Sequence, residues 1–596
     1  MSHSFHIPVL GLGFSIDTPL KVARYGISSV VSVVDDELIE RMRQHHSEKH
    51  KLPFQPIKKT EEDHRAKRIT AYLNLLNTLV DLQIIELQKR EFTPESDLTR
   101  YFDLLPDDSK QKMAYNEMLF ETHLERKKIL QENLRSNIQK GAIEVNIMSK
   151  VDKMNFGKDG LSLGDRFTDA LASLRGFAES DLNSSLILSA GMNPRLYSYL
   201  ADFDCFNAKT SSSLKKRIVL KVSDFRSALI QAKFLAKKGL WVHEFRIESG
   251  LNCGGHAFAT EGYLLGPILQ EFKDKRTEMT NELYEIYKAF YKTADGIEVD
   301  QPVTRITVQG GIGTAEENTF LQRYYNLDGT GWGSPFLLVP EATNVDKDTL
   351  NLLKDATSKD FYISGASPLG IPFNNFRKST AEIQRLERIA KGRPGSPCNK
   401  KFLVSNTEFT SEAICTASRE YQNLKIKQLQ AAELSAEQYD FKFRQITEKL
   451  CLCEGLCTSA YIKNNMLKAR ENTAVAICPG PNTAYFSGIY SLDEMVKHIY
   501  GKLNLLKNVN RPNIFINELK LYVDYLKKDI ENSAQEMSDK KIKQLERFKE
   551  QLLNGVEYYN QIFPSIQKFC DSCSKTFQQE LKNLDAQIKQ LQIELV

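Results

Sequence analysis

The sequence predicts an α/β protein built on a (β/α)8 TIM barrel. Eight short apolar runs end in glycine or small polar residues, at 7–13, 28–34, 142–148, 185–191, 217–222, 243–248, 303–309 and, most weakly, 327–333. Helix-like segments separate several of these runs, as expected for parallel strands joined by crossover helices. A doubly wound open sheet shows the same alternation, so periodicity alone leaves both architectures open.

Composition limits the class of protein and its partners. The chain has 596 residues, of which 41% are hydrophobic and 26% charged, with a net charge of +4. It can bury large cores and is expected to hold more than one domain. The nearly balanced charge, without a long run of one sign, predicts neither a nucleic-acid partner nor a membrane partner. No signal-peptide pattern and no long apolar segment is present, so we expect a cytoplasmic location with reduced cysteines.

The first two strands and the third are separated by about a hundred residues. We therefore expect the barrel to comprise 1–35 and 140–350, with a helical insertion at 36–139 that leaves the catalytic end of the second strand and is a candidate lid. Within the insertion, four apolar residues recur at helical spacing: Ile69, Leu73, Leu76 and Val80.

A crossover helix is expected at 224–239, before a glycine stop. Phe225, Leu229, Ile230 and Phe234 are predicted to share its buried face.

Two further regions follow the barrel. Residues 351–510 hold six of the ten cysteines, and 511–596 is predicted to be helical. An a/d heptad seam is formed at the end of the chain by Phe577, Leu581, Leu584, Ile588, Leu591 and Leu595. The seam predicts either an intramolecular helical hairpin with 515–560 or a homo-oligomer contact. The hairpin is favoured because so few heptads make a short coiled coil.

Three glycine-rich turns follow or span the last three predicted strands: "GLNCGGH" (250–256), "VQGGIGTAEE" (308–317) and "GTGWGSPFLLVPEA" (329–342). In a barrel, the loops after strands seven and eight converge at the C-terminal face, where backbone N–H groups can bind a phosphate. Glycine permits that close approach. Each turn alone is best explained as an ordinary tight turn, but the three in order predict one phosphate-binding rim.

These turns and the opening "IPVLGLGFSIDTPLKVARYGISSVVS" (7–32) resemble the nitronate monooxygenase family of FMN-dependent barrels, formerly called 2-nitropropane dioxygenases, which also includes flavin enoyl reductases. The resemblance covers about 5–35 and 140–345. It implies that the FMN phosphate is held by Gly310, Gly311, Ile312, Gly333 and Ser334. It places the turn of Gly11, Gly13 and Phe14 against the isoalloxazine ring. Further cofactor contacts are implied for Asn146, Lys221, Gly254 and Gly255.

The resemblance also assigns a catalytic role to His256, as the base that removes a proton from the carbon beside a nitro group. Imidazole suits this task because it titrates near neutral pH, and the electrons then pass to flavin N5 and on to oxygen. Cys253 lies three residues from His256, but that spacing in a glycine turn does not indicate a nucleophilic pair. We expect Cys253 to be a buried thiol.

The post-barrel region contains a second resemblance. "SPLGIPFNNF" (367–376) followed by spaced cysteines is similar to a segment found after the barrel in one branch of the same family. The positions that align with it, and that could bind zinc or an iron–sulfur cluster, are Cys398, Cys415, Cys451 and Cys453. Reduced structural cysteines are the favoured alternative, because the gaps fit no metal-binding motif of independent specificity.

Two classes of function follow. The first is an FMN-dependent oxidoreductase of the nitronate monooxygenase type with a small activated substrate. Within this class the runner-up is an NAD(P)H-dependent flavin enoyl reductase of fatty acid or polyketide synthesis, with an acyl substrate. The second class is a catalytically silent barrel that acts as a scaffold through its insertion and C-terminal helices.

Overall fold

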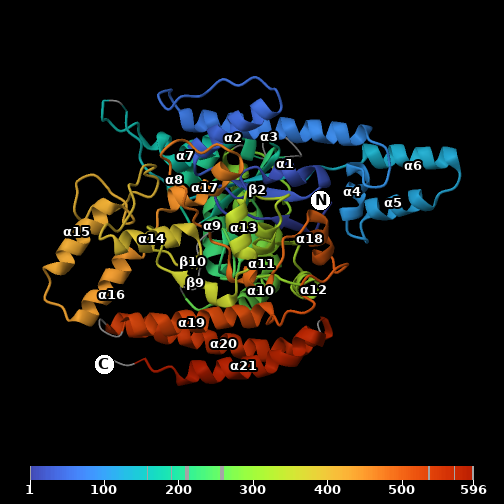
Figure 1. Ribbon diagram of the computed structural model, residues 1–596. Helices are drawn as coiled ribbons and strands as arrows, with labels where there is room; N and C mark the ends of the chain where they lie inside the picture. Colours follow the sequence, from blue (N-terminus) through green and yellow to red (C-terminus); the bar gives the residue numbers. More distant parts are fainter. Residues whose placement is uncertain are drawn as a thin grey trace.

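The computed structural model describes residues 2–157, 159–189, 191–207, 214–254, 261–294, 296–533, 537–569 and 571–593, the side chains of 571–575 excepted. Eight parallel strands form a closed barrel in sequence order (Figure 1). The strands are β1 (Phe5–Ile7), β2 (Ser28–Ser32), β3 (Ile143–Met148), β4 (Ser184–Ser189), β5 (Lys216–Val222), β6 (Val242–Glu248), β7 (Arg305–Gln309) and β8 (Gly329–Gly331). Because β1 pairs with both β2 and β8, the barrel prediction is confirmed and the open doubly wound sheet is excluded.

Strands two to eight lie within two residues of their predicted bounds, but the prediction for the first strand was wrong. It was expected at 7–13, whereas β1 ends at Ile7. Pro8 has no amide hydrogen and so cannot continue a ladder between two neighbouring strands. The glycines that follow therefore form a turn above the barrel.

Crossover helices surround the barrel: α1 (Thr18–Val22), α7 (Asp169–Ala178), α8 (Pro194–Tyr199), α9 (Phe225–Ala236), α10 (Leu265–Asp274), α11 (Arg276–Ala294) and α12 (Ala315–Tyr324). The predicted face of α9 was partly wrong. Ile230 is 54% exposed, whereas Ala228, Ala232 and Leu235 are buried. Alanine lets the helix approach the strands closely, and a pattern search for large apolar residues overlooks it.

The insertion forms five helices: α2 (Asp36–Lys49), α3 (His64–Lys89), α4 (Asp97–Leu104), α5 (Lys110–Phe120) and α6 (Leu124–Ser136). The helical pattern predicted from Ile69, Leu73, Leu76 and Val80 is confirmed, because all four lie in α3 and are fully buried. α3 packs against α2 and α7, on the outside of the barrel (Figure 1).

The region after β8 contains a small antiparallel hairpin and several helices. In order these are α13 (Lys347–Lys354), β9 (Phe361–Ser364), β10 (Phe373–Phe376), α14 (Thr380–Ala390), α15 (Arg419–Gln430), α16 (Ala436–Thr447), α17 (Leu452–Lys463) and α18 (Leu492–Ile499). A small apolar cluster of its own joins Phe373 to Leu450, Leu452 and Cys478.

The last three helices, α19 (Ile514–Ser533), α20 (Asp539–Phe569) and α21 (Asp571–Gln590), pack side by side as one layer (Figure 1). We call them the C-terminal layer. The heptad residues Phe577, Leu581, Leu584 and Ile588 are buried in it, so this seam is filled by helices of the same chain. α20 contacts α10 and α12 on the barrel, and α19 contacts α10.

One apolar core continues from the barrel into the insertion, α17, α18 and the C-terminal layer. The expected regions are therefore joined by shared packing. Across the described ranges, no helix combines the length and the apolar character needed to span a bilayer.

Candidate active site

A cavity lies at the carboxyl ends of the barrel strands. The centres of water-sized spheres can occupy about 90 Å³ of it. The barrel supplies one side of it through Pro8, Val9, Gly11, Leu12, Ser32, Asn146, Met148, Ile187, Ser189, Lys221, Arg246, Glu248 and Gln309. This is the face of a TIM barrel that carries catalytic residues.

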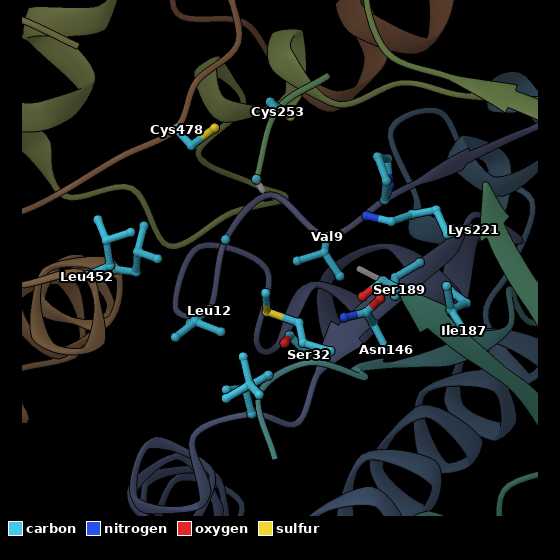
Figure 2. A pocket seen from close by; sticks show the side chains of 18 of the residues that line it. Val9, Leu12, Ser32, Asn146, Ile187, Ser189, Lys221, Cys253, Leu452 and Cys478 are labelled. Atoms are coloured by element: carbon cyan, nitrogen blue, oxygen red, sulfur yellow. The ribbon is translucent and has the colours of Figure 1, made fainter. Parts of the chain in front are cut away.

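The other side of the cavity is an apolar cover from the post-barrel region: Leu369, Phe373, Phe402, Leu403, Leu452 and Leu456. None of the lining residues comes from 36–139. A lid role for the insertion stays a prediction. The insertion supports the cover from outside, because the Arg65 guanidinium lies 5.4 Å from the ring centroid of Phe402. Figure 2 shows Leu452 across the cavity from Asn146, Ser189 and Lys221.

An ion pair lies on the barrel side of the cavity. Lys221 Nζ is 3.0 Å from Glu248 Oε2. Glu248 Oε1 accepts hydrogen bonds from Asn252 Nδ2 at 2.5 Å and from Gln309 Nε2 at 2.8 Å. The Glu248 carboxylate is thus held from three sides, and it fixes the Lys221 ammonium at the cavity surface.

A second charged group lies deeper in the barrel. Arg246 Nε donates to Glu244 Oε1 at 2.8 Å, and Arg246 Nη2 donates to Glu144 Oε2 at 3.1 Å. Burial opposes ionisation of Glu244, but Arg246 and Arg305 outweigh it and lower its pKa to about 2. Burial, together with the charge of Arg246, lowers the pKa of His6 to about 3. His6 is therefore a neutral imidazole under the cavity.

Some polar atoms that line the cavity have no partner. Within the described ranges, Ser32 Oγ and Arg246 Nη1 are buried without a hydrogen bond. A buried polar group left unpaired costs about 1–3 kcal/mol. These atoms therefore indicate a bound group that accepts hydrogen bonds from them.

The three glycine turns meet at one rim. A Cβ at Gly310 would lie 2.9 Å from Asn252 Cβ, and a Cβ at Gly333 would lie 2.5 Å from Cys253 Sγ. Residues after β6, β7 and β8 are thus in close contact. The bare backbone at these positions is required by the packing of the loops on each other.

The rim also carries unused donors. The amides of Gly311, Ile312, Gly333 and Ser334 donate to no acceptor among the described residues. Neither these four residues nor Gly310 line the cavity. The cavity does reach the nearby residues Gln309, Cys253 and Gly254. The predicted phosphate donors are therefore assembled beside the cavity, outside its wall.

Residues 478–482 bridge the rim from the post-barrel region, a contact that the sequence did not predict. Gly254 N donates to Cys478 O at 2.9 Å, and Asn482 Nδ2 donates to Ile312 O at 3.0 Å. Gly480 has φ +71°, and a Cβ there would lie 2.7 Å from Ser334 Oγ. This position therefore requires glycine on two grounds.

The other predicted site residues divide into three groups. Gly11, Asn146, Lys221 and Gly254 line the cavity. Gly13 and Phe14 do not: Gly13 N donates to Leu456 O at 3.0 Å, and Phe14 is buried in the core. Gly255 and His256 lie outside the described residues.

Cys253 is buried at the rim. Burial raises the pKa of its thiol well above the ordinary value. The thiol therefore stays protonated, as predicted for a buried cysteine, and is a poor nucleophile.

The four-cysteine metal site stays a prediction. In the part of the chain that the structure describes, no three His, Cys, Asp or Glu side chains are arranged to hold a metal ion. Cys398 and Cys415 line a separate surface cavity, whereas Cys453 lines the barrel-mouth cavity. Cys451 caps α17 and Cys453 lies in its first turn. The four thiols nevertheless lie near one another. Cys398 shares a hydrogen bond with Cys415, and burial together with the nearby Cys398 thiol raises the pKa of Cys451 and of Cys453.

Sequence reasoning missed the polar residues that end apolar strands: Ser32 at β2, Ser189 at β4, Glu248 at β6 and Gln309 at β7. A polar last residue on an otherwise apolar barrel strand was the signal that could have revealed them.

No protein-family model matches the chain, and no curated protein matches it. Among solved structures, the enoyl reductase domain of MlnA from the macrolactin biosynthesis cluster of Bacillus amyloliquefaciens is 16% identical, with a TM-score of 0.33, over 67% of this chain and 84% of that one. FabK from Thermotoga maritima is 11% identical, with a TM-score of 0.30, over 69% and 85%. Nitroalkane oxidase from Streptomyces ansochromogenes is 9% identical, with a TM-score of 0.33, over 85% and 97%. Because these scores are low, the fold assignment rests on the strand pairing.

Proposed function

We propose that this protein is an FMN-dependent oxidoreductase whose reaction takes place under the apolar cover of the barrel mouth. The observation that carries the proposal is the cavity itself, because its barrel side holds the unpartnered Ser32 Oγ and Arg246 Nη1 and its opposite side is apolar. A flat heteroaromatic ring with a polar edge suits such a cavity. The sequence resemblance to FMN-dependent barrels supports the same cofactor.

The residues present fit FMN in two parts. Ser32, Asn146, Lys221 and Arg246 would contact the polar edge of the ring. The free amides of Gly311, Ile312, Gly333 and Ser334 would hold the phosphate. When bound, FMN would supply reversible transfer of two electrons.

The chain's own groups would assist this chemistry through charge and the exclusion of water. Lys221, held by Glu248, presents a fixed positive charge to the cavity. A preorganised cation stabilises negative charge that develops nearby, and it does so more strongly where water is excluded. The apolar cover would provide that exclusion.

Two reaction types fit this site. In the nitronate monooxygenase type, His256 would remove the substrate proton and oxygen would be the final acceptor. In the alternative type, an enoyl reductase, NAD(P)H would be the electron donor and an acyl chain the substrate. The cover specifically favours the alternative, because Leu369, Leu403, Leu452 and Leu456 offer an alkyl chain an apolar surface.

The first experiment is an absorbance spectrum of the purified protein with and without added FMN. Flavin bands that stay with the protein on gel filtration support the proposal, whereas a colourless protein that takes up no FMN supports the scaffold function instead. Anaerobic bleaching by NAD(P)H, compared with bleaching by a nitronate, then separates the two reaction types.

A further inference from the structure

A buried carboxylate in the C-terminal layer contacts the barrel mouth. Glu518, on α19, is 1% exposed. Its Oε1 accepts hydrogen bonds from Ser249 Oγ at 2.7 Å and from Gly250 N at 3.2 Å. Its Oε2 accepts one from Leu265 N at 2.7 Å. All three neighbours donate, so the contacts suit an ionised carboxylate.

These contacts lie at the two ends of one loop. Ser249 and Gly250 directly follow β6, and Leu265 is the first residue of α10. One carboxylate thus fastens both ends of the segment between them. That segment includes Cys253 and Gly254, which form part of the cavity wall.

Close packing leaves the first end of the loop little room beside α19. A Cβ at Gly250 would lie 2.4 Å from the Tyr522 ring. At the other end, Gly266 N donates to Tyr559 Oη of α20 at 3.3 Å. The loop ends therefore fit against the C-terminal layer on both sides of Glu518.

We propose that Glu518 is a positioning residue that fastens the loop after β6 to the C-terminal layer and so holds the Cys253–Gly254 wall of the cavity in place. The predicted effect of Glu518 on cofactor binding rests on the function proposed above. The predicted effect of Glu518 on the loop is independent of that function.

Burial raises the pKa of Glu518 to about 7. The titratable groups that face it are the phenols of Tyr522 on α19 and Tyr559 on α20. Burial raises the pKa of both phenols far above neutrality, so they stay uncharged. Among the described residues on the β6 and α10 sides, Ser249, Gly250 and Leu265 donate hydrogen bonds to the carboxylate. Near neutral pH, Glu518 is thus the group in this contact that changes charge.

Loop attachment and global stability change in the same direction with pH. Burial in the folded protein raises the pKa of Glu518 to about 7, and release of the loop would admit water and lower it. The contribution of Glu518 to both is therefore present at low pH and is lost as pH rises through about 7. Variants of Glu518 and of a control residue then separate the loop signal from other effects of pH.

The test is hydrogen–deuterium exchange of the amides at 251–254 and 261–264 between pH 6 and 8.5, corrected for intrinsic exchange. In the unmodified protein we expect protection to fall by about fivefold across neutral pH, roughly the effect of one hydrogen bond. Glu518→Gln should remove this step, because a side-chain amide does not titrate in this range. The matched control is Glu531→Gln, an exposed residue on the same helix, which should keep the step.

A second variant tests the proposal if Glu518→Gln does not fold. Ser249→Ala removes one donor to the ionised carboxylate, so it should move the midpoint of the protection step to higher pH. The proposal is overturned if the unmodified protein shows no step, if Glu518→Gln retains it, or if Ser249→Ala leaves the midpoint unchanged.

FMN affinity, followed by quenching of flavin fluorescence, gives the second readout. The unmodified protein should bind FMN about fivefold more weakly at pH 8 than at pH 6, and Glu518→Gln should remove this difference. A protein that shows the loop step yet binds no FMN refutes the proposed function and leaves the positioning role intact. Equal FMN affinity of the unmodified protein at pH 6 and pH 8 refutes the link to the cofactor site.

Discussion

Lys221 Nζ lies 3.0 Å from Glu248 Oε2 at the barrel mouth, with the Lys221 side chain 19% and the Glu248 side chain 4% exposed. The lysine is the second-to-last residue of β5, and the glutamate is the last residue of β6. Adjacent parallel strands thus bring together two charges that lie far apart in sequence. This ion pair holds the Lys221 charge in place at the candidate active site.

Lys221→Met should destabilise the protein by about 1–3 kcal/mol, because it removes the cation from a buried carboxylate that keeps only its two amide donors. The free energy of unfolding in urea measures the effect. Lys221→Met combined with Glu248→Gln should cost less than Lys221→Met alone, since no charge is then left unpaired. Strict additivity of the two single effects would show that the pair is not coupled.

Gly333→Ala should cost about 1–3 kcal/mol through overpacking, because its Cβ would lie 2.5 Å from Cys253 Sγ. The backbone at Gly333 has φ −106°, which alanine adopts without strain. The steric contact alone should therefore decide the result. Adding Cys253→Ala should restore most of the lost thermal stability. A Gly333→Ala protein as stable as the unmodified one would mean that the rim is looser than described.

Arg511→Met should destabilise the protein by about 3–5 kcal/mol, the usual effect of leaving a buried charge unpaired. Arg511 Nη1 donates to Glu317 Oε1 at 2.7 Å, and both side chains are almost fully buried. Arg511 also donates to Gly311 O at 2.6 Å and to Asn482 Oδ1 at 2.8 Å. Arg511→Lys keeps the charge but cannot make three directed contacts, so its loss of stability should be intermediate. Equal unfolding midpoints for the methionine and lysine variants would contradict this account.

Lys216 predicts a pH dependence of stability. It is 1% exposed, and burial lowers its pKa to about 7. Between pH 7 and the ordinary lysine range the unfolded chain binds more protons than the folded protein, so this residue makes stability rise with pH. From pH 7 to 9, the unmodified protein should gain about 1–2 kcal/mol relative to Lys216→Met. If the two proteins differ in unfolding free energy by the same amount at pH 7 and at pH 9, the lowered pKa of Lys216 is refuted.

The fold was largely predictable because barrel strands are short apolar runs with clear ends. β5 and β6 appeared within one residue of their bounds, and even the three-residue β8 was found from its glycines. β1 was misplaced because the apolar run continues through Pro8 into the turn, and the missing amide hydrogen, which hydropathy does not record, ends the ladder.

The candidate site was predictable on the barrel side only. Asn146 and Lys221, implied by the family resemblance, line the cavity, as strand ends of a barrel meet at one face. The cover could not be predicted, because Phe402 and Leu452 reach the cavity through tertiary packing of a region without sequence periodicity. The cysteines show the same effect of tertiary packing: Cys398 shares a hydrogen bond with Cys415, a contact that spacing along the chain does not reveal.

The C-terminal layer has a consequence for biosynthesis. Arg511 and Glu518 fasten loops that follow β7 and β6, yet both are made long after those strands leave the ribosome. Chains that end before Arg511, for example through a premature stop codon, would lack both contacts, so the loops after β6 and β7 would be left unfastened.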